Sequence, residues 1–372
     1  MTLISKTIED KKIIWFQNSN SYLVLEAVVA NLIEKINNKV LASEIEEWII
    51  NTLDIPKNIA KEFIFNVNDL YIQNNKKHSI SKTTNTFKLS TLFYSEKYYS
   101  INNFNFFIQF ENDYLESQIH PTFAHLETTS TSNVDFHYQI FEEDDFIVFL
   151  KNKSIIGSWT KNEAHVFQGK LSMQILIDIY KKPETDWMGV FHASAISNGK
   201  ESMLFLGDSG NGKSTSLALL NANGFNCIAD DFVPIDSEKN IRTYPAAISI
   251  KKKSVATLLP YYPELKNSAE YHFKKLNKIV RFLPPNKIDY NEKLKCKALV
   301  FIKYNPNIEL EINSMSQVDA FQQLVPDSWI SPIKGNTTTF LDWFLDLPCY
   351  QLTYSNNQKM IDTVSKIFND EL

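Results

Sequence analysis

The chain of 372 residues lacks most features of secreted, membrane-spanning and nucleic-acid-binding proteins. Its three cysteines, Cys227, Cys296 and Cys349, are far apart and match no metal-ligand spacing, which favours reduced thiols in a cytoplasmic protein. No apolar run approaches the length of a membrane span, and Glu9 and Asp10 follow the start too closely for a signal peptide. The formal net charge of −5 gives no electrostatic reason to expect a nucleic-acid partner. We therefore expect a protein that binds neither membranes nor nucleic acids.

One segment differs sharply from this background. It is the run Gly207-Asp208-Ser209-Gly210-Asn211-Gly212-Lys213-Ser214-Thr215, which matches the P-loop pattern. An apolar run at residues 203–206 predicts a strand before it, and a helix-forming stretch follows it. In such a loop the backbone N–H groups bind phosphate oxygens, Lys213 reaches the terminal phosphates and Ser214 can ligate Mg²⁺. Residues 207–215 are therefore predicted to form a nucleotide site.

Two adjacent acidic residues, Asp230 and Asp231, follow the next predicted strand at residues 225–229. Carboxylates beside a phosphate-binding loop are suited to Mg²⁺ binding and to proton abstraction. Because neighbouring side chains on a strand point to opposite faces, we expect the two residues to have different roles. His192 falls on a predicted strand at residues 190–196, where it is either an ordinary sheet histidine or a group that approaches the phosphates.

The first 75 residues show helical periodicity. One helix is predicted near residues 25–36, a second begins at a capping box formed by Ser43 and Glu46, and a third follows Pro56. Polar residues without apolar periodicity then predict a linker at residues 73–86.

The remainder predicts an α/β protein with a mixed sheet. Residues 76–185 are rich in strand-like patterns, and they form either a domain of their own or an extension of the region at residues 186–372. In that last region Asn198-Gly199 predicts a tight hairpin. The strand before the P-loop is then antiparallel to its predecessor, so the sheet cannot be purely parallel.

Three sequence blocks together resemble the catalytic domain of bacterial HPr kinase/phosphorylase, a family that shares its fold with phosphoenolpyruvate carboxykinases. The blocks are His192-Ala193, residues 207–214 and Ala229-Asp230-Asp231, and the resemblance is close over residues 190–236. It implies ATP and Mg²⁺ as cofactors, with Lys213 on the terminal phosphates and Ser214 helping to hold the metal. It also implies that Asp231 takes the proton from an acceptor serine, that Asp230 assists it or binds metal, and that His192 lies beside the pair.

The chain departs from this family in one respect. The downstream glycine-rich signature with paired glutamates and an arginine is not present, which argues against HPr itself as the substrate. Only Arg242 and Arg281 are arginines in this chain. Arg281 is a candidate for the cation that stabilises the transition state, and a surface or nucleotide-contacting role fits its position equally well.

The amino-terminal region resembles a PqqD-type winged-helix domain in residues 22–36, 42–50 and 59–70. Such domains recognise leader segments of ribosomally made precursor peptides, typically by pairing the leader as an added strand on a sheet edge. A generic three-helix unit is the alternative interpretation of the same apolar spacing.

Together these features predict an ATP- and Mg²⁺-dependent kinase that phosphorylates a serine on a peptide or small protein, whose leader the amino-terminal domain captures. One alternative is an HPr serine kinase that regulates carbohydrate metabolism. Another is a nucleotide-binding adaptor without catalysis in a peptide-modification pathway. Either a monomer or a homo-oligomer is compatible with these features.

Overall fold

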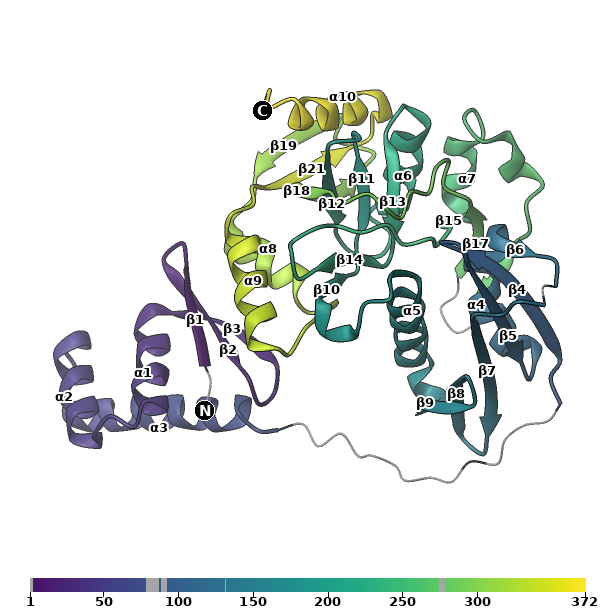
Figure 1. Ribbon diagram of the computed structural model, residues 1–372. Helices are drawn as coiled ribbons and strands as arrows, with labels where there is room; N and C mark the ends of the chain where they lie inside the picture. Colours follow the sequence, from purple (N-terminus) through teal and green to yellow (C-terminus); the bar gives the residue numbers. More distant parts are fainter. Residues whose placement is uncertain (1–2, 78–86, 88–91, 131, 274–277) are drawn as a thin grey trace. The chain divides into compact units, whose positions relative to one another are not determined.

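The computed structural model describes residues 3–77, 87, 92–130, 132–273 and 278–372 (Figure 1). The chain forms two compact units, which we call the small unit (Met1–Thr83 with Met315–Leu347) and the large unit (Thr84–Ser314 with Pro348–Leu372). Helices combined with mixed sheets confirm the predicted α/β class. The predicted three-region division did not anticipate that residues 315–347 belong with the amino-terminal residues. No helix in the described part of the chain is both long and apolar enough to cross a membrane.

The small unit begins with an antiparallel sheet in the order β1-β2-β3, which comprises β1 (Leu3–Ile8), β2 (Lys11–Phe16) and β3 (Ser21–Glu26). Three helices follow it: α1 (Ala27–Asn37), α2 (Ala42–Leu53) and α3 (Lys57–Asn74). Ile14 and Phe16 of β2 share an apolar cluster with all three helices. The three predicted helices are thus confirmed.

Two boundary predictions in this unit need correction. The capping box predicted at Ser43 is wrong, because α2 begins at Ala42 with Leu41 as its N-cap and no side-chain cap. Ser43 therefore lies inside the first helical turn. The predicted linker at residues 73–86 overlaps the end of α3, and its residues 78–86 lie outside the described residues.

Residues from a distant part of the sequence cover the other face of the same sheet. Residues 315–347 contain α8 (Gln317–Leu324), β20 (Ser328–Ile330) and α9 (Lys334–Leu345). The Tyr22 ring of β3 packs edge-on against Phe321 and Phe340, at centroid distances of 6.0 and 5.8 Å. Because this second layer is present, β2 is buried on both faces, and Ile13 and Trp15 are fully buried as well as Ile14 and Phe16.

The large unit is organised around a six-stranded mixed sheet in the order β13-β11-β12-β18-β21-β19 (Figure 1). Its strands are β11 (Ser194–Ser197), β12 (Glu201–Leu206), β13 (Asn226–Asp230), β18 (Lys295–Tyr304), β19 (Leu310–Ser314) and β21 (Cys349–Tyr354). β12 is antiparallel to β11 and parallel to β18, which confirms the predicted mixed sheet and hairpin. Helices α6 (Lys213–Ala222) and α10 (Asn357–Phe368) contribute to the apolar core beside this sheet.

The strand predicted at residues 190–196 is wrong as a single element. The chain instead forms β10 (Trp187–Phe191), which pairs with β14 (Val233–Asp236), and then β11, which pairs with β12 and β13. Between the two strands, the Ala193 N–H donates to the carbonyl oxygen of Phe191 at 2.9 Å in a tight turn. His192 therefore lies at a bend where the chain passes from one sheet to another.

The predicted β-rich region forms a second six-stranded sheet within the large unit, in the order β6-β4-β5-β7-β8-β9. Its strands are β4 (Ser95–Ile101), β5 (Phe104–Phe110), β6 (Glu127–Thr128), β7 (Phe136–Glu143), β8 (Phe146–Lys151) and β9 (Ser154–Thr160). The helices α4 (Asp113–Phe123) and α5 (Ala164–Tyr180) belong to the same region.

A smaller antiparallel sheet in the order β15-β17-β16 completes the large unit. It consists of β15 (Ile248–Lys251), β16 (Tyr271–Phe273) and β17 (Lys278–Leu283), and the helix α7 (Lys252–Leu258) follows β15 directly. Ile248 and Ile250 of β15 pack in the same apolar core as α6. This packing holds β15 beside the start of α6, where the predicted site lies.

Candidate functional site

The glycine-rich loop, residues 207–212, connects β12 to α6. Gly207, Gly210 and Gly212 have φ angles of 127°, 106° and 101°, in the region that other residues rarely adopt. A Cβ atom at Gly207 would lie 2.9 Å from the carbonyl oxygen of Ile302 on the neighbouring strand. The loop is therefore restricted to glycine at these points, and it presents its backbone at the N-terminus of α6, an arrangement that favours phosphate oxygens.

Contacts on either side hold this loop in place. The Tyr304 N–H donates to the carbonyl oxygen of Asn211 at 2.9 Å, and the Asn211 N–H donates to that of Asp208 at 3.1 Å. Lys213 is buried, and its Nζ donates to the carbonyl oxygen of Gly207 at 2.6 Å, so the ammonium lies across the loop. The Thr215 hydroxyl instead faces α7, where it donates to Ser254 at 2.9 Å.

Asp230 ends β13 and is buried beneath the loop. Its Oδ1 accepts hydrogen bonds from the hydroxyls of Ser194 at 2.6 Å and Ser214 at 3.2 Å, and its Oδ2 accepts from the Ser249 N–H at 3.0 Å. Burial, followed by the charge of Asp231, raises the pKa of Asp230 to about 7, although the three hydrogen bonds oppose this shift. A carboxylate held in this way would gain from a nearby cation.

Asp231 has a different environment. Its φ angle of 60° takes the chain out of β13, and its side chain is 49% exposed. The Nε2 atom of His192 lies 3.9 Å from its Oδ1, so a protonated His192 forms an ion pair with it. The structure thus brings together His192, Asp230 and Asp231 as predicted, with one carboxylate buried and the other exposed.

Two lysines lie beside the loop, Lys251 at the end of β15 and Lys253 in α7. Lys251 donates from Nζ to the Ser209 hydroxyl at 2.9 Å, and a Cβ atom at Gly210 would lie 3.8 Å from the Nζ of Lys253. Burial and then the charges of Lys278 and Lys253 lower the pKa of Lys251. These lysines were not predicted as site residues, because a short lysine run carries no signal of a site until the fold brings β15 to the loop.

Arg281 lies away from this group, on β17. Its guanidinium donates to the carbonyl oxygens of Leu265, Lys266 and Ser268, and its Nη2 atom lies 3.0 Å from Oε1 of Glu270. These partners all belong to the segment 265–270, which the arginine orders. The structure does not bring Arg281 to the aspartate pair.

The donor set around Ser214 and Asp230 can be compared with what Mg²⁺ requires. Within the described ranges, no group of three or more histidine, cysteine, aspartate or glutamate side chains could hold a metal ion. Mg²⁺ sites in phosphate-binding proteins, however, are commonly formed by one or two protein oxygens, substrate phosphates and water. One serine hydroxyl and one buried carboxylate, 3.2 Å apart beside the glycine-rich loop, fit that requirement.

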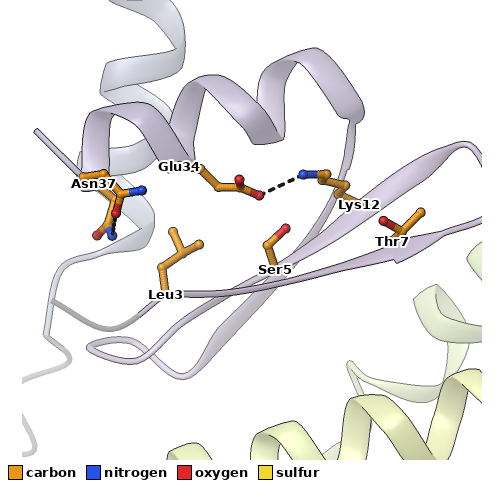
Figure 2. Close-up of a pocket in the computed structure, with 7 residues that line it drawn as sticks. Leu3, Ser5, Thr7, Lys12, Glu34 and Asn37 are labelled. Atoms are coloured by element: carbon orange, nitrogen blue, oxygen red, sulfur yellow. Dashed lines mark hydrogen bonds and ion pairs between the residues drawn. The ribbon is translucent and has the colours of Figure 1, made fainter. Parts of the chain in front are cut away.

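The small unit has a polar pocket of its own, of about 360 Å³, between β1 and α1 (Figure 2). The side chains of Leu3, Ser5 and Thr7 project from β1 toward α1, and Lys12 projects from β2 to form an ion pair with Glu34 at 3.0 Å. Asn37 and Asn38, at the end of α1, complete the lining. The pocket lies beside an edge strand, because β1 pairs only with β2 among the described strands.

Comparisons with known proteins give no family for this chain. The chain matches no protein-family model. It also matches no curated protein.

Proposed function

We propose that the protein is an ATP- and Mg²⁺-dependent kinase with a P-loop core of the HPr kinase type. The observation that carries this proposal is the convergence of three groups: a glycine-rich loop at a helix N-terminus, a buried carboxylate bonded to Ser214, and an exposed carboxylate beside His192. A phosphate site alone would require only the loop. The accessible Asp231 adds a base, which phosphoryl transfer to a hydroxyl uses.

In the proposed reaction, the backbone of residues 207–212 and the Lys213 ammonium bind the ATP phosphates. The acceptor hydroxyl gives its proton to Asp231 as its oxygen attacks the terminal phosphorus, and His192 holds the carboxylate in position. Ser214 and Asp230 would hold Mg²⁺, which neutralises charge on the phosphates when it is bound. The acceptor is a serine of a peptide or small protein.

The small unit is proposed to be a winged-helix module of the PqqD type that captures the leader of a precursor peptide. Two features support this role: an edge strand, β1, whose outer side no described strand pairs with, and the adjoining polar pocket (Figure 2). An extended peptide can add to such an edge through its backbone while its side chains enter the pocket. Leader capture would raise the concentration of the acceptor serine at the aspartate pair.

Two other functions are compatible with parts of the site. An HPr serine kinase would use the same loop and base, but it would not need the small unit. A nucleotide-binding adaptor would use the loop without the base, so the conformation of Asp231 beside His192 favours the kinase.

The deciding experiment is a phosphotransfer assay read by intact mass, with Mg²⁺, ATP, the short peptides encoded near this gene, and HPr as a parallel acceptor. We expect one phosphate on a peptide, and a loss of about a thousandfold in rate for Asp231→Asn with nucleotide affinity retained. Transfer to HPr alone would support the metabolic regulator. Nucleotide binding without any transfer would support the adaptor.

A further inference from the structure

The cation that phosphoryl transfer normally needs cannot come from an arginine in this chain. Arg242 is buried, with its Nη2 atom 2.9 Å from the carbonyl oxygen of Tyr290 and its guanidinium 4.7 Å from the Tyr180 ring centroid. Arg281 is bonded to the segment 265–270. Because these are the two arginines of the sequence, a permanently charged cationic side chain at the glycine-rich loop has to be a lysine.

Strand β15 connects the carboxylates to one such lysine. The Ser249 N–H binds Oδ2 of Asp230 at 3.0 Å, and Lys251, two residues later, places its Nζ 2.9 Å from the Ser209 hydroxyl of the loop. Residues two apart on a strand project to the same side. Strand β15 therefore contacts Asp230 through its backbone and the glycine-rich loop through the Lys251 ammonium.

Positive charge accumulates around Lys251. The groups that act on its charge are Lys278 on β17, Lys253 on α7, Lys213 on α6 and the carboxylate of Asp231. Three like charges thus act on Lys251 against one opposite charge, and burial, followed by their repulsion, lowers its pKa. A bound polyanion would relieve the repulsion among these lysines. They are therefore suited to a triphosphate, and in particular to its terminal phosphoryl group during transfer.

We propose that Lys251 is a catalytic residue whose ammonium contacts the transferring phosphoryl group and stabilises the charge that develops there. The inference rests on the kinase function proposed above. As the acceptor oxygen bonds to the terminal phosphorus, the bond from that phosphorus to the bridging oxygen breaks. Its electron pair stays on ADP, and the acceptor proton passes to Asp231. Lys251 leaves the Ser209 hydroxyl and donates to the equatorial oxygens of the phosphoryl group as it moves.

The test separates nucleotide binding from recognition of the transferring group and needs no acceptor. Affinities are measured by calorimetry for MgADP alone and for MgADP with aluminium fluoride, which mimics the phosphoryl group in transfer. The proteins are the wild type, Lys251→Gln, Lys251→Arg and the matched control Lys252→Gln. Lys252 is the adjacent lysine, exposed and 3.8 Å from Glu270 Oε2.

For Lys251→Gln we expect MgADP affinity within about threefold of the wild type and a loss of about 100-fold in affinity for the fluoroaluminate complex. Lys251→Arg should recover most of that loss, and Lys252→Gln should behave as the wild type. Equal losses for both ligands in Lys251→Gln would indicate that Lys251 merely orders the loop, and undiminished fluoroaluminate affinity would exclude contact; either result overturns the inference while leaving the kinase intact. A wild type that bound no nucleotide would overturn both.

Discussion

The candidate sites of the two units lie at different parts of their sheets. In the small unit the pocket lies along the edge strand β1, and all its lining residues fall within positions 3–38 of the sequence. In the large unit the site forms where strands end, and its groups come from β11, β12, β13 and β15 and the turns beside them. An edge exposes repeated backbone groups, which suit an extended chain, whereas strand ends collect unlike side chains at one point, which suits chemistry.

The largest effect on the strand-end site of the large unit is expected from a change in the loop at the end of β12. Gly207→Ala should lower the free energy of unfolding by about 3 kcal/mol, because the new Cβ would meet the carbonyl oxygen of Ile302 at 2.9 Å with φ at 127°. The same change at Gly169, where a Cβ meets nothing within 4 Å, is the matched control and should be neutral or slightly stabilising. Urea titrations measure both. Equal stabilities for the two variants would show that the loop tolerates a side chain.

A smaller effect is expected from the buried carboxyl at the end of β13. Folding raises the pKa of Asp230 from 3.8 to about 7, so the folded state holds the proton more tightly than the unfolded state. The protonated carboxyl therefore contributes stability that is fully present below pH 3.8 and is lost as the pH rises through 7. Asp230→Asn cannot ionise, so without Mg²⁺ it should keep on the order of 2 kcal/mol more stability at pH 8 than the wild type.

Melting temperatures from pH 5 to pH 8 check this expectation. Mg²⁺ with ADP should reduce the stability difference between Asp230→Asn and the wild type at pH 8. A bound cation stabilises the ionised carboxylate, which only the wild type has. Parallel pH profiles for Asp230→Asn and the wild type would show that Asp230 does not titrate in this range.

The smallest effect concerns the edge of β1. Ser5→Arg would fill the polar pocket and should weaken binding of a leader peptide about tenfold, or about 1.4 kcal/mol, without changing ATP affinity. Ser43→Arg makes the same replacement at an exposed position of α2, outside the pocket, and is the matched control. Fluorescence anisotropy with a labelled peptide measures both. A leader that binds Ser5→Arg as tightly as the wild type would move the peptide site away from β1.

The parts of the site that could be predicted from the sequence are those that short-range rules determine. The loop and Lys213 follow from one contiguous pattern. Different environments for Asp230 and Asp231 were predicted from strand alternation, but they arise because Asp231 leaves β13 with a φ angle of 60°. Ser194 and Ser249 could not be predicted, since each reaches Asp230 through pairing or packing between separate elements. The bend at His192 was missed because an apolar run does not reveal where a chain changes sheets.

The fold shows the same division. Periodicity predicted the helices of the small unit and the strand-rich character of residues 76–185. It could not predict that residues 315–347 cover the sheet at the start of the chain, because an amphipathic helix does not specify which surface it covers. The uninterrupted apolar run of β2, residues 13–16, was the available signal, since a strand buried on both faces lacks alternation.

That second layer has a consequence for how the protein is made. Ile13 and Trp15 leave the ribosome early, yet the helices that carry Phe321 and Phe340 emerge only after most of the large unit has been translated. At a translation rate of roughly 5 to 20 residues per second, one apolar face of the nascent sheet stays exposed for about fifteen seconds to a minute. Over that interval a chaperone, or a transient neighbour in the emerging chain, would have to shield it from aggregation.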